Sequence, residues 1–177
     1  MKLPVRVRSS HPESGVTQIT AIRPHAMSSV KDEIHAALRK LGLSAQIFRE
    51  LPDCEGESAY RKALRHFVPV GEPRWWWEHF ISSVSVDFPA GNGWEHITEF
   101  VPDASEHVWF IVEDDSLAFY PVYDATPTAL RAVIAECYGF EYYIVQRELQ
   151  WLLCETHHNR MVGVGRVIEE RLREYVV

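Results

Sequence analysis

The chain has 177 residues, of which 46% are hydrophobic and 24% charged, and this composition is typical of one globular domain rather than two. Its formal net charge of −7 argues against a general nucleic-acid binder, because such proteins need a basic surface, and favours a basic protein partner. No apolar run approaches the roughly 18 residues of a membrane span, and no apolar stretch of a secretory signal follows the basic residues 1–10. The sequence therefore predicts a cytoplasmic protein without membrane contact, and it leaves the oligomeric state open.

The N-terminal part of the chain is predicted to be a lead-in followed by one domain. Residues 1–27 show no steady periodicity and are expected to be partly ordered, whereas residues 28–177 are expected to form a single α+β domain. Hydrophobic residues at helical spacing predict a helix over 30–41, with Ser29 as its N-cap and Gly42 as its stop.

Two further helices are predicted before the middle of the chain. They cover residues 45–51 and 57–68, and Pro69 ends the second one. We expect the N-terminal helices to cover one side of a sheet. Residues 75–81 and 94–101 fit a helix or a strand equally well.

Alternating hydrophobic residues then predict a mostly antiparallel sheet of four to six strands. The candidate strands are residues 84–88, 108–112, 117–122, 140–145, 149–154 and 161–164. Between and after them, a helix begins at Pro127 after the cap Thr126, and a last helix covers residues 166–175. The predicted fold class is α+β, with helices packed on the sheet.

Four reactive side chains, Cys154, Glu155, His157 and His158, lie together after a predicted strand. Cysteine and histidine are common zinc ligands, and a Cys/His pair can act as a nucleophile, so these residues are candidates for catalysis. Their spacing matches no recognised ligand signature, and adjacent histidines on a strand point to opposite faces. The alternative is a buried cysteine followed by a hydrogen-bonded turn. We expect no metal and no cofactor.

Arg74 precedes three consecutive tryptophans, Trp75, Trp76 and Trp77. Three successive side chains cannot all face one core, so at least one ring is expected at a surface, a cleft or an interface. Arg74 could stack on one of these rings, and Trp94 is expected to belong to the same binding site. The alternative is packing between the core and the N-terminal helices.

Acidic residues of the second half are candidates for acid–base chemistry. They are Glu113, Asp114, Asp115, Asp124, Glu141 and Glu155. Residues 113–115 are interpreted as a solvated hairpin turn, whereas Glu141 and Glu155 are expected on neighbouring strands, where they could approach one another. Residues 163–165 (GVG) are interpreted as a tight turn, because they complete no phosphate-binding motif.

Several segments of the second half resemble a family of small uncharacterised bacterial proteins of the domain-of-unknown-function type. The segments are residues 109–113 (WFIVE), 120–123 (YPVY), 140–145 (FEYYIV), 151–158 (WLLCETHH) and 162–165 (VGVG). The resemblance covers roughly residues 72–176 and implies no catalytic assignment. By a looser analogy, such small acidic proteins resemble toxin-immunity proteins, including the SUKH-type superfamily.

Three functions compete at this point. The favoured one is a non-catalytic protein-binding module, of the kind that neutralises a bacterial toxin, because an acidic surface speeds association with a basic enzyme. The second is an enzyme or zinc-binding protein that uses the Cys154/His157/His158 loop. The third is a small-ligand-binding domain whose pocket is lined by residues 75–77, Trp94 and Trp109.

Overall fold

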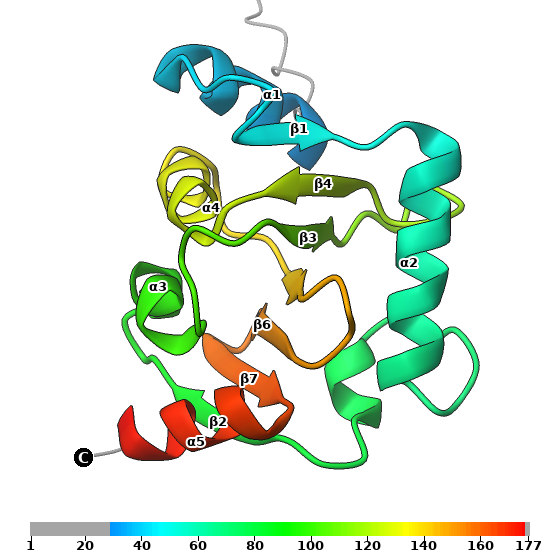
Figure 1. Cartoon of the computed structure of the whole chain (residues 1–177), viewed down its shortest axis with the longest axis vertical. Coiled ribbons are helices and arrows are strands. Elements are labelled where there is room, and N and C mark those ends of the chain that lie inside the picture. Colours follow the sequence, from blue (N-terminus) through cyan, green and yellow to red (C-terminus); the bar gives the residue numbers. More distant parts are fainter. Residues whose placement is uncertain (1–28, 176–177) are drawn as a thin grey trace, which may run out of the picture.

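Seven strands form one antiparallel sheet in the computed structural model of the chain, which describes residues 29–175 (Figure 1). The sheet order is β1-β4-β3-β5-β6-β7-β2. The strands are β1 (Phe48–Glu50), β2 (Val84–Asp87), β3 (Val108–Val112), β4 (Val122–Ala125), β5 (Tyr142–Val145), β6 (Leu152–Thr156) and β7 (Arg160–Val164). The α+β class is confirmed, but the prediction of four to six strands is wrong by one strand. The predicted lead-in over residues 1–27 lies outside the described residues.

The additional strand is β1, at a place where the sequence predicts a helix over residues 45–51. Its residues pair with β4, and the first pair is Phe48 with Ala125. The segment is too short to show a periodicity of its own, so the pairing with the edge of β4 decides its structure. Burial of Phe48 against Phe110 and Tyr123 stabilises this pairing.

In place of the strand predicted over residues 117–122, the structure has a strand further along the chain, β4. β4 begins at Val122, which pairs with Ile111 of β3, so residues 113–121 form a broad turn between the two strands. Leu117, near the middle of this turn, is 47% exposed. The apolar residues of the turn therefore do not mark a strand.

Helices α1 and α5 have the predicted bounds, whereas α2 begins at Asp53, before the predicted residue 57. They are α1 (Val30–Leu41), α2 (Asp53–Phe67), α3 (Ile97–Phe100), α4 (Pro127–Ile134) and α5 (Arg166–Tyr175), with short 3-10 turns η1 (Trp76–His79) and η2 (Gly93–His96). The capping box of Ser29 with Asp32 is confirmed, and Gly42 ends α1 with a left-handed φ of 62°. The two segments that fit a helix or a strand equally well, residues 75–81 and 94–101, are thus helical: the first contains η1, and the second contains η2 followed directly by α3.

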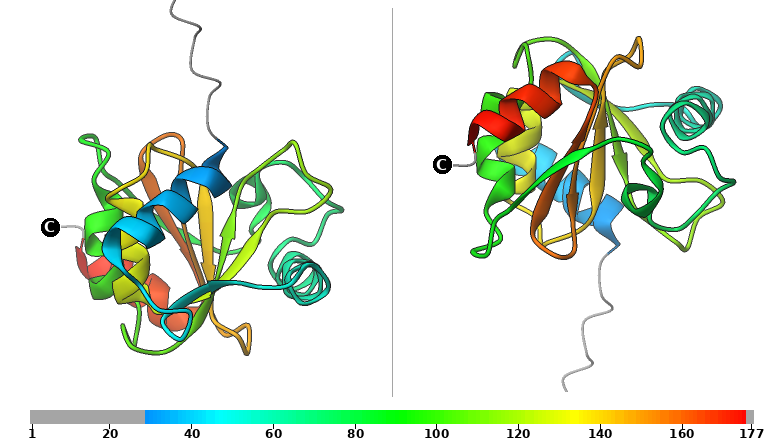
Figure 2. Two further views of the ribbon diagram at one scale, coloured as in Figure 1. Left: turned by 90° about the horizontal axis from the view of Figure 1, so that it is seen from above. Right: turned by 90° about the horizontal axis from the view of Figure 1, so that it is seen from below.

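Helices cover both faces of the sheet. Buried residues of α1, α3, α4 and α5 belong to one hydrophobic cluster, and those of α2 and η1 belong to another on the opposite face (Figure 2). The prediction that the N-terminal helices share one side is therefore not confirmed, since α1 and α2 lie on different faces. No helix within residues 29–175 has the length and apolarity needed to cross a membrane.

Candidate functional site

An open groove of about 680 Å³ lies at one end of the sheet, where several turns meet. It is bounded by the start of α1, the segment before η1, the β3–β4 turn, and the residues next to β5 and β6. Its charged and aromatic lining residues are Arg74, Trp75, Glu113, Asp114, Asp115, Glu141 and His157. We call this the acidic groove, because carboxylates dominate its lining.

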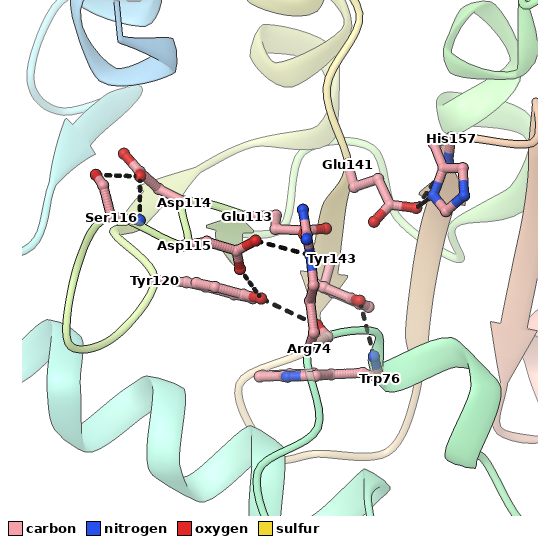
Figure 3. A network of polar contacts seen from close by, with 10 residues as sticks. All are labelled: Arg74, Trp76, Glu113, Asp114, Asp115, Ser116, Tyr120, Glu141, Tyr143 and His157. Atoms are coloured by element: carbon pink, nitrogen blue, oxygen red, sulfur yellow. Dashed lines mark hydrogen bonds and ion pairs between the residues drawn. The ribbon is translucent and has the colours of Figure 1, made fainter.

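Arg74 is the cation of the acidic groove, and two carboxylates hold it. Its Nε lies 3.2 Å from Glu113 Oε1 and 2.7 Å from Asp115 Oδ2 (Figure 3). The guanidinium carbon lies 5.2 Å from the centre of the Trp75 ring, as the sequence predicted for one of the three tryptophans. The Tyr120 hydroxyl donates a hydrogen bond of 2.9 Å to the backbone carbonyl of Arg74, which fixes this segment against the β3–β4 turn.

Glu113 and Glu141 form a buried carboxyl pair at the side of the groove. Their side chains are only 10% and 7% exposed. The backbone places them together, because β3 and β5 pair up to Val112 and Tyr142, and the Glu113 N–H donates to the Glu141 carbonyl at 3.1 Å. Within residues 29–175, the Oε2 atoms of both side chains are buried and lack a hydrogen-bond donor. Two buried carboxylates repel each other, so one of them must carry a proton or meet a cation.

The protonation of this pair is uneven. Burial raises the pKa of Glu113 to about 8, and the nearby carboxylate of Glu141 acts in the same direction, against the opposing effect of Arg74. Burial also acts to raise the pKa of Glu141, but the neighbouring Glu113 carboxyl and the hydrogen bonds from His157 lower it overall. Glu113 is therefore the member that holds the proton near neutral pH, and Glu141 is the ionised one.

His157 closes the row of polar groups. Its backbone N–H and its ring Nδ1 both lie 2.7 Å from Glu141 Oε1. The ring also contacts the Trp75 ring, with 5.3 Å between centroids, and the rings of Trp77 and His158. Arg74 thus contacts the Glu113 side of the carboxyl pair, and His157 contacts the Glu141 side (Figure 3).

A second, more enclosed cavity of about 370 Å³ shares Glu141 and His157 with the groove. Trp94 and Glu155, two of the predicted site residues, line this cavity rather than the groove. The Tyr142 hydroxyl donates to Glu155 Oε2 at 2.7 Å. Burial raises the pKa of Glu155, and backbone N–H groups of η2 that bond the carboxylate partly offset this effect. Glu155 therefore ties η2 to the sheet.

Cys154 lies on the other face of β6, within the cluster that α2 covers. It is fully buried, and burial raises the pKa of its thiol well above the usual range, so a reactive thiolate is disfavoured. The described residues contain no group of three or more His, Cys, Asp or Glu side chains that could hold a metal ion. Of the predicted loop, the structure brings His157 and His158 together and separates Cys154 from the groove.

The tryptophans are divided among different environments. Trp76 is fully buried and stacks on Tyr143 at 4.6 Å, so it belongs to the core rather than to a binding surface. Trp75 lines the acidic groove, and Trp77 packs beside it at 6.4 Å. Trp109 lines a separate pocket next to α2. Within residues 29–175, these rings therefore do not line one common pocket, as the third of the competing functions requires.

Sequence reasoning missed the acidic pair because it placed Glu113 in a solvated turn and matched Glu141 with Glu155. Glu113 directly follows one strand, and Glu141 directly precedes another. These positions reveal the pair only when the two strands are known to lie side by side. Asp124 lies on β4, where it pairs with Trp109 near the start of β3, and Arg49, Arg147 and His107 contact it. It therefore does not join the groove.

Comparisons with known proteins identify a family but not an activity. The model of a family described as a family of unknown function (DUF6756) matches residues 26–176. The match begins well before residue 72, so it includes the N-terminal helices that the sequence resemblance left out. No curated protein matches the chain, and no solved structure matches it.

Proposed function

We propose that this chain, which belongs to the family of unknown function DUF6756, is a non-catalytic module that binds a basic protein partner through the acidic groove. The observation that carries the proposal is the convergence of four carboxylates, Glu113, Asp114, Asp115 and Glu141, on one open groove beside the half-buried Trp75. A lysine or arginine side chain fits such a lining, because the carboxylates attract its charge and the indole ring stacks on it.

The kind of partner follows from the charge of the whole chain. A net charge of −7 speeds association with a basic protein and disfavours nucleic acid. We propose, as the specific case, a cytoplasmic immunity-type role in which the groove neutralises a basic toxin enzyme. A toxin active site is often basic when its substrate is a nucleic acid, and an acidic surface would compete for it.

The proposal is tested with a hexa-arginine peptide and a hexa-glutamate peptide, titrated against the full chain by calorimetry. We expect only hexa-arginine to bind, with an affinity that falls as salt screens the charges. W75A and the double variant D114N/D115N should each weaken binding by about tenfold, which corresponds to the loss of one or two polar or cation–π contacts. The control E170Q removes one charge from α5, where Glu170 pairs with Arg166, and should bind normally.

The biological partner is then sought by affinity purification from the native host. A basic protein retained by the wild-type chain and by E170Q, but lost from D114N/D115N, would support the proposal. Hexa-arginine binding that all of these variants share would place the interaction outside the groove and contradict it.

A further inference from the structure

The carboxyl pair at the side of the groove can hold a proton, and simple attraction of a basic partner does not require this property. Both carboxyl groups line the groove, and both are nine-tenths buried or more. Each has one oxygen with a partner: Glu113 Oε1 meets Arg74, and Glu141 Oε1 meets His157. In the described part of the chain, the remaining oxygen of each has no donor. A single proton between the two groups would give both oxygens a partner.

We propose that Glu113 and Glu141 hold one proton between them in the free protein and release it when a cationic side chain of the basic partner enters the groove. This inference rests on the proposed function and adds to it the ligand group, a guanidinium or ammonium, and a dependence on pH. The exchange is balanced: the O–H bond of the Glu113 carboxyl breaks, the proton passes to the solvent, and the cation takes over its charge.

The surroundings of the pair favour this exchange. The charged and titratable groups that face it are Arg74 from the segment before η1, Asp115 and Tyr120 from the β3–β4 turn, Tyr143 from β5, Cys154 from β6 and His157 from the β6–β7 turn. Arg74 is the only permanent cation among these, and it is already shared between Glu113 and Asp115. One cation for three carboxylates leaves room for a second positive charge, which is a proton in the free protein.

The burial of the pair makes the proton hard to remove until a cation arrives. Water cannot solvate the second carboxylate, so the free protein keeps the neutral form of Glu113. A cation beside the pair stabilises the ionised form directly, and the proton then leaves. Binding of the cation and loss of the proton are therefore linked, and the affinity for the cation must rise with pH.

The test is calorimetry of hexa-arginine binding in buffers that differ in ionisation enthalpy, near pH 7. We expect the wild-type chain to release about one proton per bound peptide, and its affinity to rise by up to about tenfold between pH 6.5 and 7.5. E113Q cannot hold this proton, so it should release none and bind with an affinity that does not change over this range. The control D114N changes another carboxyl group of the same groove to an amide but keeps the carboxyl pair, and it should still release the proton.

The outcomes separate this inference from the proposed function. If wild-type chain binds hexa-arginine without releasing a proton, or if E113Q releases as many protons as wild type, the exchange is wrong while groove binding stands. If hexa-arginine does not bind at all, the proposed function fails first, and this inference fails with it.

A spectroscopic measurement on the wild-type chain covers the case in which E113Q does not fold. The infrared carbonyl band of a protonated carboxyl group should be present near pH 7 and should lose intensity when hexa-arginine is added. E155Q serves as a second variant, because Glu155 is the other buried carboxyl of the neighbouring cavity. A band that the peptide leaves unchanged in both wild type and E155Q would overturn the proposal.

Discussion

At the scale of single residues, two neighbours in the sequence have opposite roles. Trp76 lies in the core between aromatic rings, and its backbone N–H donates to the Tyr143 hydroxyl at 3.1 Å. Trp75 is half-buried and lines the acidic groove under Arg74. One residue therefore stabilises the fold, and the other is available for recognition.

This difference predicts different costs for the same truncation. W76A leaves a large cavity in the core and should lower the free energy of unfolding by about 3–5 kcal/mol. W75A removes a partly exposed ring and should cost less than about 1 kcal/mol. Urea unfolding followed by far-ultraviolet circular dichroism measures both values. Equal costs for the two variants would show that Trp75 is a core residue as well.

Glu113 gives the protein a stability that depends on pH. Its pKa rises to about 8 in the folded protein from an ordinary value of 4.5, so the folded state binds a proton more tightly than the unfolded state. This contribution is complete below the ordinary pKa and is lost as the pH rises through about 8. The wild-type chain should therefore lose on the order of 4 kcal/mol of unfolding free energy between about pH 5 and pH 9 through this group.

The variant E113Q isolates this contribution, because its amide stays neutral over the whole range. The difference in unfolding free energy between E113Q and wild type should move in favour of E113Q as the pH rises. Denaturation with urea at several pH values measures this difference, and E170Q serves as the exposed control. A difference that stays constant with pH would mean that Glu113 ionises normally in the folded protein.

At the scale of elements, α5 packs on the sheet because β7 has a glycine beneath it. A Cβ atom at Gly163 would lie 2.6 Å from Leu172 Cδ1 and would overlap Ile168, two fully buried residues of α5. The glycine thus allows a close approach of helix and strand. The sequence assigns Gly163 both to the candidate strand 161–164 and to the tight turn 163–165, and the structure places it in the strand.

The close approach at Gly163 predicts the effect of a single methyl group. G163A should force α5 away from β7 and lower the free energy of unfolding by about 1–3 kcal/mol. G139A is the matched control, since a Cβ at Gly139 meets no atom within 4 Å, and it should change stability little. Thermal unfolding measures both, and hydrogen exchange should show the loss of protection in α5. Unchanged protection in G163A would contradict this packing.

At the scale of the whole molecule, the sequence predicts the helices and strands better than it predicts which strands pair with each other. The helix 30–41 and the final helix 166–175 agree with α1 and α5, because their caps and periodicity are local. Pairing between distant strands has no local signal. The sequence therefore misses β1 and the adjacency of β3 and β5.

The same limit explains how much of the site could be predicted. The stacking of Arg74 on a tryptophan follows from neighbours in the sequence, and the structure shows it at Trp75. The carboxyl pair depends on β3 lying beside β5, so Glu113 and Glu141 could not be joined from periodicity alone. Burial is also a property of the assembled fold, since the β3–β4 turn packs against Arg74 and thereby shields Glu113 from water.

The central claim is that the acidic groove receives a cationic group beside Trp75. The most direct test is nuclear magnetic resonance of the indole N–H signals of the six tryptophans during titration with hexa-arginine. The Trp75 signal should shift and saturate with the peptide, while the signals of Trp109 and Trp151 stay in place. A Trp75 signal that does not move while another tryptophan responds would contradict the account.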